Sequence, residues 1–445
     1  MMTRTQILAL VLTLSAGTVA IADDWPQWLG PRRDGVWREQ GILETFPADG
    51  PKVRWRAPVG AGYSGPSVAD GRVIITDRIL PEGTKNPANA FATDKVNGTE
   101  RILCLDEKTG KVLWKHEYPC PYEVSYPLGP RASPLIDGDK VYTLGTMGHL
   151  FCFDVKTGKE LWSKNFRTDY EAPVPLWGFA AHPLLDGDRL ICLVGGKGSL
   201  VVAFDKNTGK ELWKNLSVKE PGYCPPTMIE AGGKRQLIIW HPEGIASLDP
   251  ATGKEYWSQP WRIRAALSIP TPVQAGDYLF VSSFYNGSLL LKLDRDKPAA
   301  SVVWESKCRG ERPNQTTDLN SIMPTPFIRD GHIYGVCSYG ELRCLDLVSG
   351  KRLWETFKPI AGESVRWGNA FLVENAGRFF LFNEKGDLVI AKLTPKGYEE
   401  ISRAHLLDPT NSMPRRPVIW THPAFANQSV YVRNDKELIC FSLAK

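Results

Sequence analysis

The 445-residue sequence lacks the local patterns that mark metal, haem and nucleic-acid proteins. Its nine cysteines include no Cys-x-x-Cys pair and no Cys-x-x-Cys-His, so zinc, iron–sulfur and c-type haem sites have no local support. Lysine and arginine are scattered singly and the formal net charge is only +5, whereas nucleic-acid binding proteins more often carry basic runs or a basic face. We therefore expect no nucleic-acid partner.

Motifs of common enzyme classes are missing as well. The sequence has no Gly-x-Ser-x-Gly elbow and no phosphate-binding loop, so hydrolase and nucleotide-binding functions lack support. His182 and His422 both precede prolines, but no carboxylate at strand or helix spacing completes a metal-binding set around either of them. The sequence thus predicts no catalytic residue and no metal ligand.

Residues 1–22 have the pattern of a secretory signal peptide. Arg4 lies in a short basic segment, an apolar run extends from Ile7 to Leu14, and Ala20-Ile21-Ala22 fits the small-residue cleavage site. No cysteine follows this site to carry a lipid, and no later run is long and apolar enough to span a bilayer. We expect cleavage after Ala22 and a soluble periplasmic or secreted protein without a transmembrane segment.

The composition is that of a globular chain, but the 15 tryptophans are unusual. Several of them end copies of one motif, in which an alternating apolar segment leads to Asp, a Thr-Gly or Ser-Gly turn follows, and a second extended segment carries Trp. The copy from Cys104 to Trp114 is complete, and the copy that ends at Trp304 is degraded. The motif tryptophans are Trp114, Trp162, Trp213, Trp257, Trp304 and Trp354, spaced 48, 51, 44, 47 and 50 residues apart.

Each motif predicts two strands joined by a tight turn, because Asp can bond the amides of the turn and Gly adopts a positive φ freely. A second hairpin lies upstream of each pair, with turns such as Asp137-Gly138, so every unit is a four-stranded antiparallel sheet. Sheets of this kind repeated along a chain indicate an all-β fold, the β-propeller.

Counting the units gives eight blades. A seventh unit with an eroded motif runs from Asn369 to about Ala404, and the last unit, from Thr421 to Lys445, is one strand short. The segment Val53-Arg54-Trp55 would supply that strand and close the ring. The predicted organisation is a signal peptide (1–22), a lead-in segment (23–52) and an eight-bladed propeller (53–445).

The motif Ala-x-Asp-x-x-Thr-Gly-x-x-x-Trp resembles the tryptophan-docking motif of pyrroloquinoline quinone (PQQ) propellers. The opening from Asp24-Trp25-Pro26 to Asp34-Gly35 also resembles the lead-in of secreted bacterial PQQ-like propellers. The resemblance covers nearly all of the mature chain and implies an eight-bladed ring, as in quinoprotein alcohol dehydrogenases and in the assembly lipoprotein BamB. It defines the architecture far better than the activity, because one fold hosts many functions.

The tryptophans and cysteines have structural interpretations. Each motif Trp can stack on the neighbouring blade and donate its indole N–H to a backbone carbonyl, and Trp55 joins this set. Trp25, Trp28 and Trp37 of the lead-in are expected to cover an end of the propeller, with a partner contact as the alternative. Cys104 and other motif cysteines replace a small core residue, whereas the loop cysteines Cys120, Cys224 and Cys308 are candidates for a disulfide.

The loops that cross from one blade to the next are long and should converge on one face around the central channel. Aromatic, basic and amide side chains in them form a candidate funnel that suits stacking and hydrogen bonding to a planar or sugar-like ligand. The alternative is that the same side chains only pack the loops together. The candidate ligand-binding residues are Arg131, Trp177, His182, Arg366, Trp367, Asn369, Trp420 and His422.

Two functions are compatible with this sequence. The first is an exported, monomeric, non-catalytic scaffold that binds an envelope protein, peptide or glycan through the crossover loops. The alternative is a PQQ-dependent dehydrogenase that oxidises an alcohol, polyol or sugar and uses PQQ and calcium. The resemblance implies that such enzymes cover the quinone with a disulfide between consecutive cysteines and hold calcium with Glu, Asn and Asp. This chain has no consecutive cysteines, and we expect no cofactor.

Overall fold

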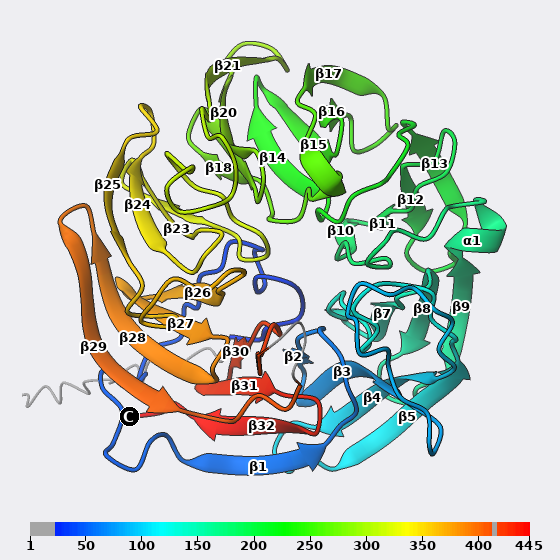
Figure 1. Ribbon diagram of the computed structural model, residues 1–445. Coiled ribbons are helices and arrows are strands. Elements are labelled where there is room, and N and C mark those ends of the chain that lie inside the picture. Colours follow the sequence, from blue (N-terminus) through cyan, green and yellow to red (C-terminus); the bar gives the residue numbers. More distant parts are fainter. Residues whose placement is uncertain (1–22, 412–415) are drawn as a thin grey trace, which may run out of the picture.

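A computed structural model describes residues 23–411 and 416–445 of the chain. These residues form eight four-stranded antiparallel sheets that follow one another around a ring (Figure 1). The expectation of an eight-bladed all-β propeller is therefore confirmed. The proposed signal peptide and its cleavage site lie outside the described residues.

The first four blades follow directly in chain order, and the innermost strand is named first in each. Blade one consists of β2 (Ser67–Ala69), β3 (Arg72–Ile79), β4 (Thr99–Asp106) and β5 (Val112–Pro119). Blade two consists of β6 (Leu135–Asp137), β7 (Lys140–Leu144), β8 (His149–Asp154) and β9 (Glu160–Asn165). Blade three consists of β10 (Leu184–Asp186), β11 (Arg189–Leu193), β12 (Val201–Asp205) and β13 (Glu211–Asn215). Blade four consists of β14 (Thr227–Ala231), β15 (Lys234–His241), β16 (Gly244–Leu248) and β17 (Glu255–Pro260).

The other four blades complete the ring. Blade five consists of β18 (Val273–Ala275), β19 (Tyr278–Ser283), β20 (Gly287–Leu293) and β21 (Ala300–Glu305). Blade six consists of β22 (Phe327–Arg329), β23 (His332–Val336), β24 (Leu342–Asp346) and β25 (Arg352–Thr356). Blade seven consists of β26 (Ala370–Asn375), β27 (Arg378–Asn383), β28 (Asp387–Thr394) and β29 (Gly397–His405). Blade eight consists of β30 (Ala424–Ala426), β31 (Ser429–Arg433), β32 (Glu437–Ser442) and, outermost, β1 (Val53–Pro58).

Strand β1 closes the ring by joining the two ends of the chain. It pairs antiparallel with β32, and Trp55 lies opposite Cys440 in the register. This is the strand that the sequence predicted from Val53-Arg54-Trp55. A short helix α1 (Phe166–Asp169) and a 3-10 helix η1 (Arg264–Ala266) interrupt the loops between blades. Among the described residues, no helix has the length and apolar character needed to cross a membrane.

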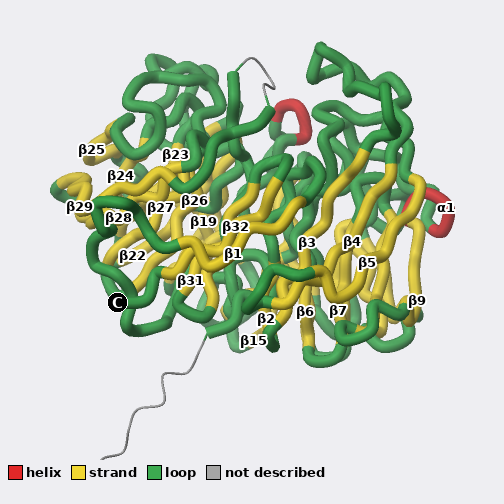
Figure 2. The backbone as a smooth tube through the Cα atoms, turned by 90° about the horizontal axis from the view of Figure 1, so that it is seen from below, coloured by secondary structure: helices red, strands yellow, loops and turns green. Residues whose placement is uncertain are grey.

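The two faces of the ring carry different connections (Figure 2). One face, here called the crossover face, carries the loops from the outer strand of each blade to the inner strand of the next. The described residues of these crossover loops are 59–66, 120–134, 166–183, 216–226, 261–272, 306–326, 357–369, 406–411 and 416–423. The opposite face carries the short turns between the first and second strands and between the third and fourth strands of each blade.

The motif turns adopt the expected geometry. In blade one, the side-chain oxygen of Asp106 accepts hydrogen bonds from the backbone amide of Thr109 at 2.9 Å and from its hydroxyl at 2.7 Å. Gly110 then takes a φ of +70°, which glycine adopts at little cost. The hydrogen bonds from Thr109 lower the pKa of Asp106 more than burial raises it. The same Asp therefore remains ionised in the turn at neutral pH.

The motif tryptophans link each blade to the next. The indole N–H of Trp213 donates to the Pro250 carbonyl at 3.2 Å, and its ring lies over the turn glycine Gly253. The same pair of contacts recurs for Trp55, Trp114, Trp162 and Trp304. Trp354 donates to the carbonyl of Thr394 in the eroded turn of blade seven.

Trp257 departs from this pattern. Its N–H donates to Gln236 Oε1 of its own blade at 2.8 Å. The turn of blade five, where the motif is degraded, has Pro298 and no glycine in the motif position. The structure also places the small motif residue directly across from the tryptophan of its own blade, as in the pair Ser247 and Trp257.

All nine cysteines are free thiols in the structure, so the expectation of a disulfide among the loop cysteines is wrong. The three thiols lie in three different crossover loops, and each has its own partner. The sulfur of Cys120 lies 3.9 Å from His149 Nδ1, Cys224 donates to the Pro225 carbonyl at 3.4 Å, and Cys308 donates to the Tyr285 carbonyl at 3.6 Å.

Candidate ligand-binding cavity

A cavity of about 370 Å³ opens among the crossover loops over the central channel. Its volume falls within the range of small-molecule sites, which runs from about 300 to 1,000 Å³. Aromatic rings dominate the lining. They belong to Trp28, Tyr63, Phe91, Tyr126, Trp177, His182, Tyr223, Phe284, Tyr285, Trp367, Phe371, Trp420 and His422. Among the described residues, the lining contains no Asp, Glu, Asn or Gln, and Arg131 is its single cationic side chain.

The structure brings most of the predicted funnel residues together. Those that line the cavity are Arg131, Trp177, His182, Trp367, Trp420 and His422. Arg366 and Asn369 do not line it. Whether the side chains in the cavity bind a ligand remains a prediction.

Arg366 lies behind the lining and supports it. Its guanidinium pairs with Glu311 at 2.9 Å and stacks over Trp367, 4.7 Å from the ring centroid. Trp367 takes a φ of +63°, and its backbone amide donates to the Ser338 carbonyl at 2.8 Å. Arg366 and Glu311 thus bind two neighbouring crossover loops to each other. Asn369 is 1% exposed, and neither polar atom of its side chain has a hydrogen-bond partner among the described residues.

Arg131 is held by backbone carbonyls. Its guanidinium donates to the carbonyls of Gly129 at 2.6 Å, Ser125 at 3.0 Å and Tyr126 at 2.7 Å. It also lies over the ring of Tyr63, 5.2 Å from the centroid. Burial lowers the pKa of Arg131, although the side chain stays cationic at neutral pH. The buried hydroxyl of Tyr63 has no hydrogen-bond partner among the described residues, so this polar atom is available to a ligand.

The floor of the cavity is formed where the inner strands begin. The six inner strands of three residues, β2, β6, β10, β18, β22 and β30, each start directly after a proline. The residues before these prolines, here called the pre-proline ring, are Gly65, Ser133, His182, Thr271, Thr325 and His422. A proline restricts the residue before it to extended backbone, so all six enter the channel in similar conformations.

The two histidines of the pre-proline ring are buried and neutral. The amide of Ser133 donates to His182 Nδ1 at 2.8 Å, and the Ser133 hydroxyl is hydrogen-bonded to His422 Nε2. Burial lowers the pKa of His422 to about 3, and burial, with smaller contributions from the neighbouring His422 and Arg33, lowers the pKa of His182 well below its usual range. Neither imidazole carries a charge at neutral pH.

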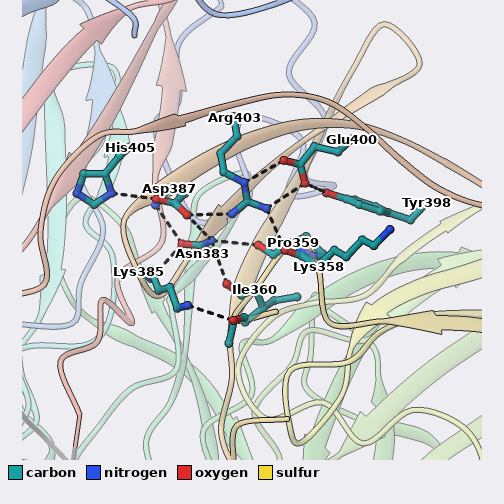
Figure 3. A network of polar contacts seen from close by, with 11 residues as sticks. Lys358, Pro359, Ile360, Asn383, Lys385, Asp387, Tyr398, Glu400, Arg403 and His405 are labelled. Atoms are coloured by element: carbon teal, nitrogen blue, oxygen red, sulfur yellow. Dashed lines mark hydrogen bonds and ion pairs between the residues drawn. The ribbon is translucent and has the colours of Figure 1, made fainter. Parts of the chain in front are cut away.

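A polar network on blade seven holds two of the crossover loops that carry lining residues (Figure 3). Asn383 donates to the carbonyls of Pro359 at 3.0 Å and Ile360 at 3.3 Å in the loop that carries Trp367. His405 contacts Asp387 at 2.9 Å and Asp408 at 3.1 Å, and Asp408 lies in the loop that carries Trp420.

Charge in this network favours the protonated form of His405. Burial lowers the pKa of His405, but the hydrogen bonds to Asp387 and Asp408 outweigh burial and raise it above its ordinary value. Arg403 adds an ion pair to Asp387 at 2.9 Å. His405 therefore connects the crossover loop that carries Asp408 to the end of blade seven, whereas Asn383 holds the loop that carries Trp367.

Several lining residues escaped sequence analysis because their place in the chain follows no repeat. Trp28 comes from the lead-in segment, and Phe91 from the loop between β3 and β4 inside blade one. Tyr223 and Phe371 lie just before or at the start of an inner strand. The proline before the inner strand, which also precedes β14 in blade four, is the signal that could have located the channel in seven blades.

The chain and its fold resemble known proteins. A family model described as outer membrane protein assembly factor BamB matches residues 45–222, 98–356 and 241–445. BamB from Moraxella catarrhalis is 16% identical, with a TM-score of 0.52, over 83% of this chain and 97% of that one. Quinohemoprotein alcohol dehydrogenase from Comamonas testosteroni is 14% identical, with a TM-score of 0.61, over 95% of this chain and 80% of that one. The curated proteins include no significant match.

Proposed function

Because the chain belongs to the family of the outer membrane protein assembly factor BamB, we propose that it is a non-catalytic binding scaffold of the cell envelope. It takes an apolar segment of another envelope protein or peptide into the cavity of the crossover face. The observation that carries this proposal is the lining itself, which consists mainly of aromatic rings and, in the part of the chain that the structure describes, contains no carboxylate or carboxamide side chain.

The composition of the lining favours a protein segment over a glycan. Sugar hydroxyls need several side-chain hydrogen-bond partners, and the short carboxylate and amide side chains best suited to this role are missing from the lining. The mouth of the cavity is apolar as well, since Phe91 is 47% and Leu176 46% exposed. Exposed apolar groups beside an aromatic cavity are typical of a protein contact.

The residues present do not fit the calcium of the alternative function. Calcium requires several oxygen ligands, usually carboxylates and amides, and the lining offers none from such side chains. Glu384, a buried carboxylate next to Trp420, is already paired with Arg416 at 2.8 Å and accepts from the Trp420 indole at 3.3 Å. No group of three or more His, Cys, Asp or Glu in the described part of the chain is placed to hold a metal.

The proposed location is the periplasm or the extracellular space, and the proposed mature form is a monomer that begins after Ala22. The signal-like pattern of residues 1–22 supports export. Periplasmic export would also place the scaffold in the same compartment as the envelope proteins proposed as its partners.

The proposal is tested by capture of envelope proteins on the immobilised protein. Phe91→Ser combined with Leu176→Ser should reduce specific capture at least tenfold, because it removes the apolar mouth. Thermal unfolding should change little, since both side chains are about half exposed. The matched control is Leu113→Ser with Leu161→Ser, which replaces leucines of similar exposure, 49% and 43%, on the outer strands of blades one and two.

Two outcomes would overturn the scaffold function. If both double variants lose capture equally, binding depends on general surface apolarity and not on the cavity. If the protein shows saturable binding of PQQ with calcium and dye-linked oxidation of an alcohol or sugar, the quinoprotein alternative replaces the scaffold.

A further inference from the structure

The lead-in segment crosses the channel on the side opposite the crossover loops. Trp25 pairs with Val68 of β2 through two backbone hydrogen bonds of 2.8 and 2.9 Å. The Ile136 amide of β6 donates to the Pro26 carbonyl at 2.9 Å, and the Trp37 amide donates to the Glu374 carbonyl of β26 at 2.8 Å. The segment is seen in dark blue across the middle of the ring in Figure 1.

At the centre of this path, Trp28 projects into the pre-proline ring and is 6% exposed. Its indole stacks on His182 with centroids 4.3 Å apart and planes 4° apart. It meets His422 edge-on at 4.5 Å, and its N–H donates to the Thr271 hydroxyl at 2.9 Å. The Trp28 indole thus stacks on a residue of one blade, meets a residue of a second blade edge-on and donates its N–H to a residue of a third.

We infer that the pre-proline ring is a binding site for an uncharged planar bicyclic ring with one hydrogen-bond donor, and that the chain fills this site with its own Trp28. The inference goes beyond the proposed scaffold function and does not depend on any partner.

The site is built by the blades without help from the lead-in. Ser133 fixes both imidazoles, since its amide donates to His182 and its hydroxyl is hydrogen-bonded to His422. The Thr271 amide donates to the Thr325 hydroxyl at 3.2 Å, which joins two further members of the ring. A binding site whose side chains hold one another in place keeps its shape when the bound ring is removed.

Small residues leave the room that the indole needs. Gly65 lies so close to His422 that a Cβ atom there would be 2.3 Å from Nε2. A side chain at Gly65 would therefore clash with the His422 ring that contacts the indole.

The backbone of the lead-in is bent to deliver Trp28. Leu29 and Arg33 adopt the left-handed conformation, with φ of +61° and +56°, which is unfavourable for residues with a side chain. Arg33 then anchors the turn by donating to the Pro183 carbonyl at 3.0 Å. Because Leu29 is held in this conformation, we infer that the contacts of the lead-in segment around Trp28 outweigh the local strain.

The test is chemical rescue of the variant Trp28→Ala. We expect free indole to bind this variant saturably in calorimetry, with one site per chain, and to raise its Tm with the logarithm of indole concentration. The wild-type protein should bind no indole at this site. Indole should bind about fivefold more tightly than 1-methylindole, which lacks the N–H, because the hydrogen bond to Thr271 contributes roughly 1 kcal/mol.

Adding Thr271→Val to Trp28→Ala should remove the preference for indole while leaving the binding of 1-methylindole unchanged. If indole binds but its preference survives Thr271→Val, the indole occupies some other void and the assigned site is wrong. If folded Trp28→Ala binds no indole at all, the pre-proline ring is no ring-binding site. Neither result depends on the capture of envelope proteins. Failure of this inference can therefore be distinguished from failure of the scaffold function.

The wild-type protein provides a second measurement if Trp28→Ala does not fold. The indole N–H resonance of Trp28 can be assigned by its loss in the conservative variant Trp28→Phe. We expect this resonance to exchange slowly with solvent, and Thr271→Val to shift it and accelerate its exchange. An indole resonance that does not respond to Thr271→Val would overturn the inference.

Discussion

Acid should destabilise the protein through the buried histidines of the pre-proline ring, and His422→Phe should remove a defined part of that effect. Burial lowers the pKa of His422 from 6.5 to about 3 in the folded chain, while the unfolded chain exposes the imidazole and titrates near 6.5. A base with a depressed folded pKa contributes stability that is complete above pH 6.5. That contribution falls as the pH decreases from 6.5 toward 3, because only the unfolded state takes up the proton.

The size of the effect follows from the shift. One proton taken up by the unfolded chain alone changes the free energy of unfolding by about 1.4 kcal/mol for each pH unit. Between pH 7.5 and 4.5, His422 should therefore account for a loss of roughly 2.7 kcal/mol. His422→Phe keeps an aromatic ring beside Phe371, which packs against His422 at 5.8 Å, but it does not titrate. Its lost contact with Ser133 adds an offset that is independent of pH.

The assay is urea unfolding of wild type and variant at half-unit steps from pH 7.5 to 4.5. The stability advantage of wild type should shrink by about 2.7 kcal/mol from pH 7.5 to 4.5. His405→Gln is the matched control with the opposite sign. The raised pKa of His405 gives stability that is present below pH 6.5 and lost as the pH rises through the folded value. Parallel curves for wild type and His422→Phe would refute the assignment of a neutral, buried imidazole.

Two further predictions concern the tryptophan contacts of the blades and the free thiols. Trp213→Phe should lower the free energy of unfolding by about 2 kcal/mol in urea, because it strands the buried Pro250 carbonyl. Trp257→Phe should cost less than about 1 kcal/mol, because Gln236 keeps its bond from Ser247; equal losses would contradict an inter-blade role. A maleimide should label the folded protein once, at the partly exposed Cys308, and nine times after denaturation, since the other thiols are buried. Labelling that survives Cys308→Ser would show that a buried thiol is reached in the folded state.

The blades could be predicted from the sequence because their determinants are local. Asp106, Gly110 and Trp114 lie within one hairpin, and their roles follow from turn geometry and strand alternation. Trp257, whose neighbouring turn in blade five is degraded, donates to Gln236 of its own blade. What the motif does not contain is the contact across blades, in which the indole of one blade covers the turn glycine of the next.

The cavity could be predicted only in part. Arg131, Trp177 and Trp420 lie in crossover loops, which any closed ring of this kind directs toward one face, so their approach to the channel follows from topology alone. The disulfide expectation was wrong because topology places the cysteines on one face but does not define the distance between Cys120 and Cys224. Each thiol contacts a neighbouring group instead, His149 for Cys120 and the Pro225 carbonyl for Cys224.

Trp28 shows why the floor of the cavity was beyond sequence reasoning and how the fold nevertheless specifies it. The lead-in has no repeat, so nothing in the local pattern places Trp28 beside His182 and His422. The residues that surround Trp28, in contrast, occupy a position that is repeated from blade to blade. A proline before each three-residue inner strand sets the direction of the preceding side chain, and blades that share this device carry small or neutral residues there. Repetition in the six blades with three-residue inner strands thus builds a ring of similar positions. Two histidines, hydrogen-bonded to one serine between them, make this ring asymmetric, so that it holds a single indole in one orientation.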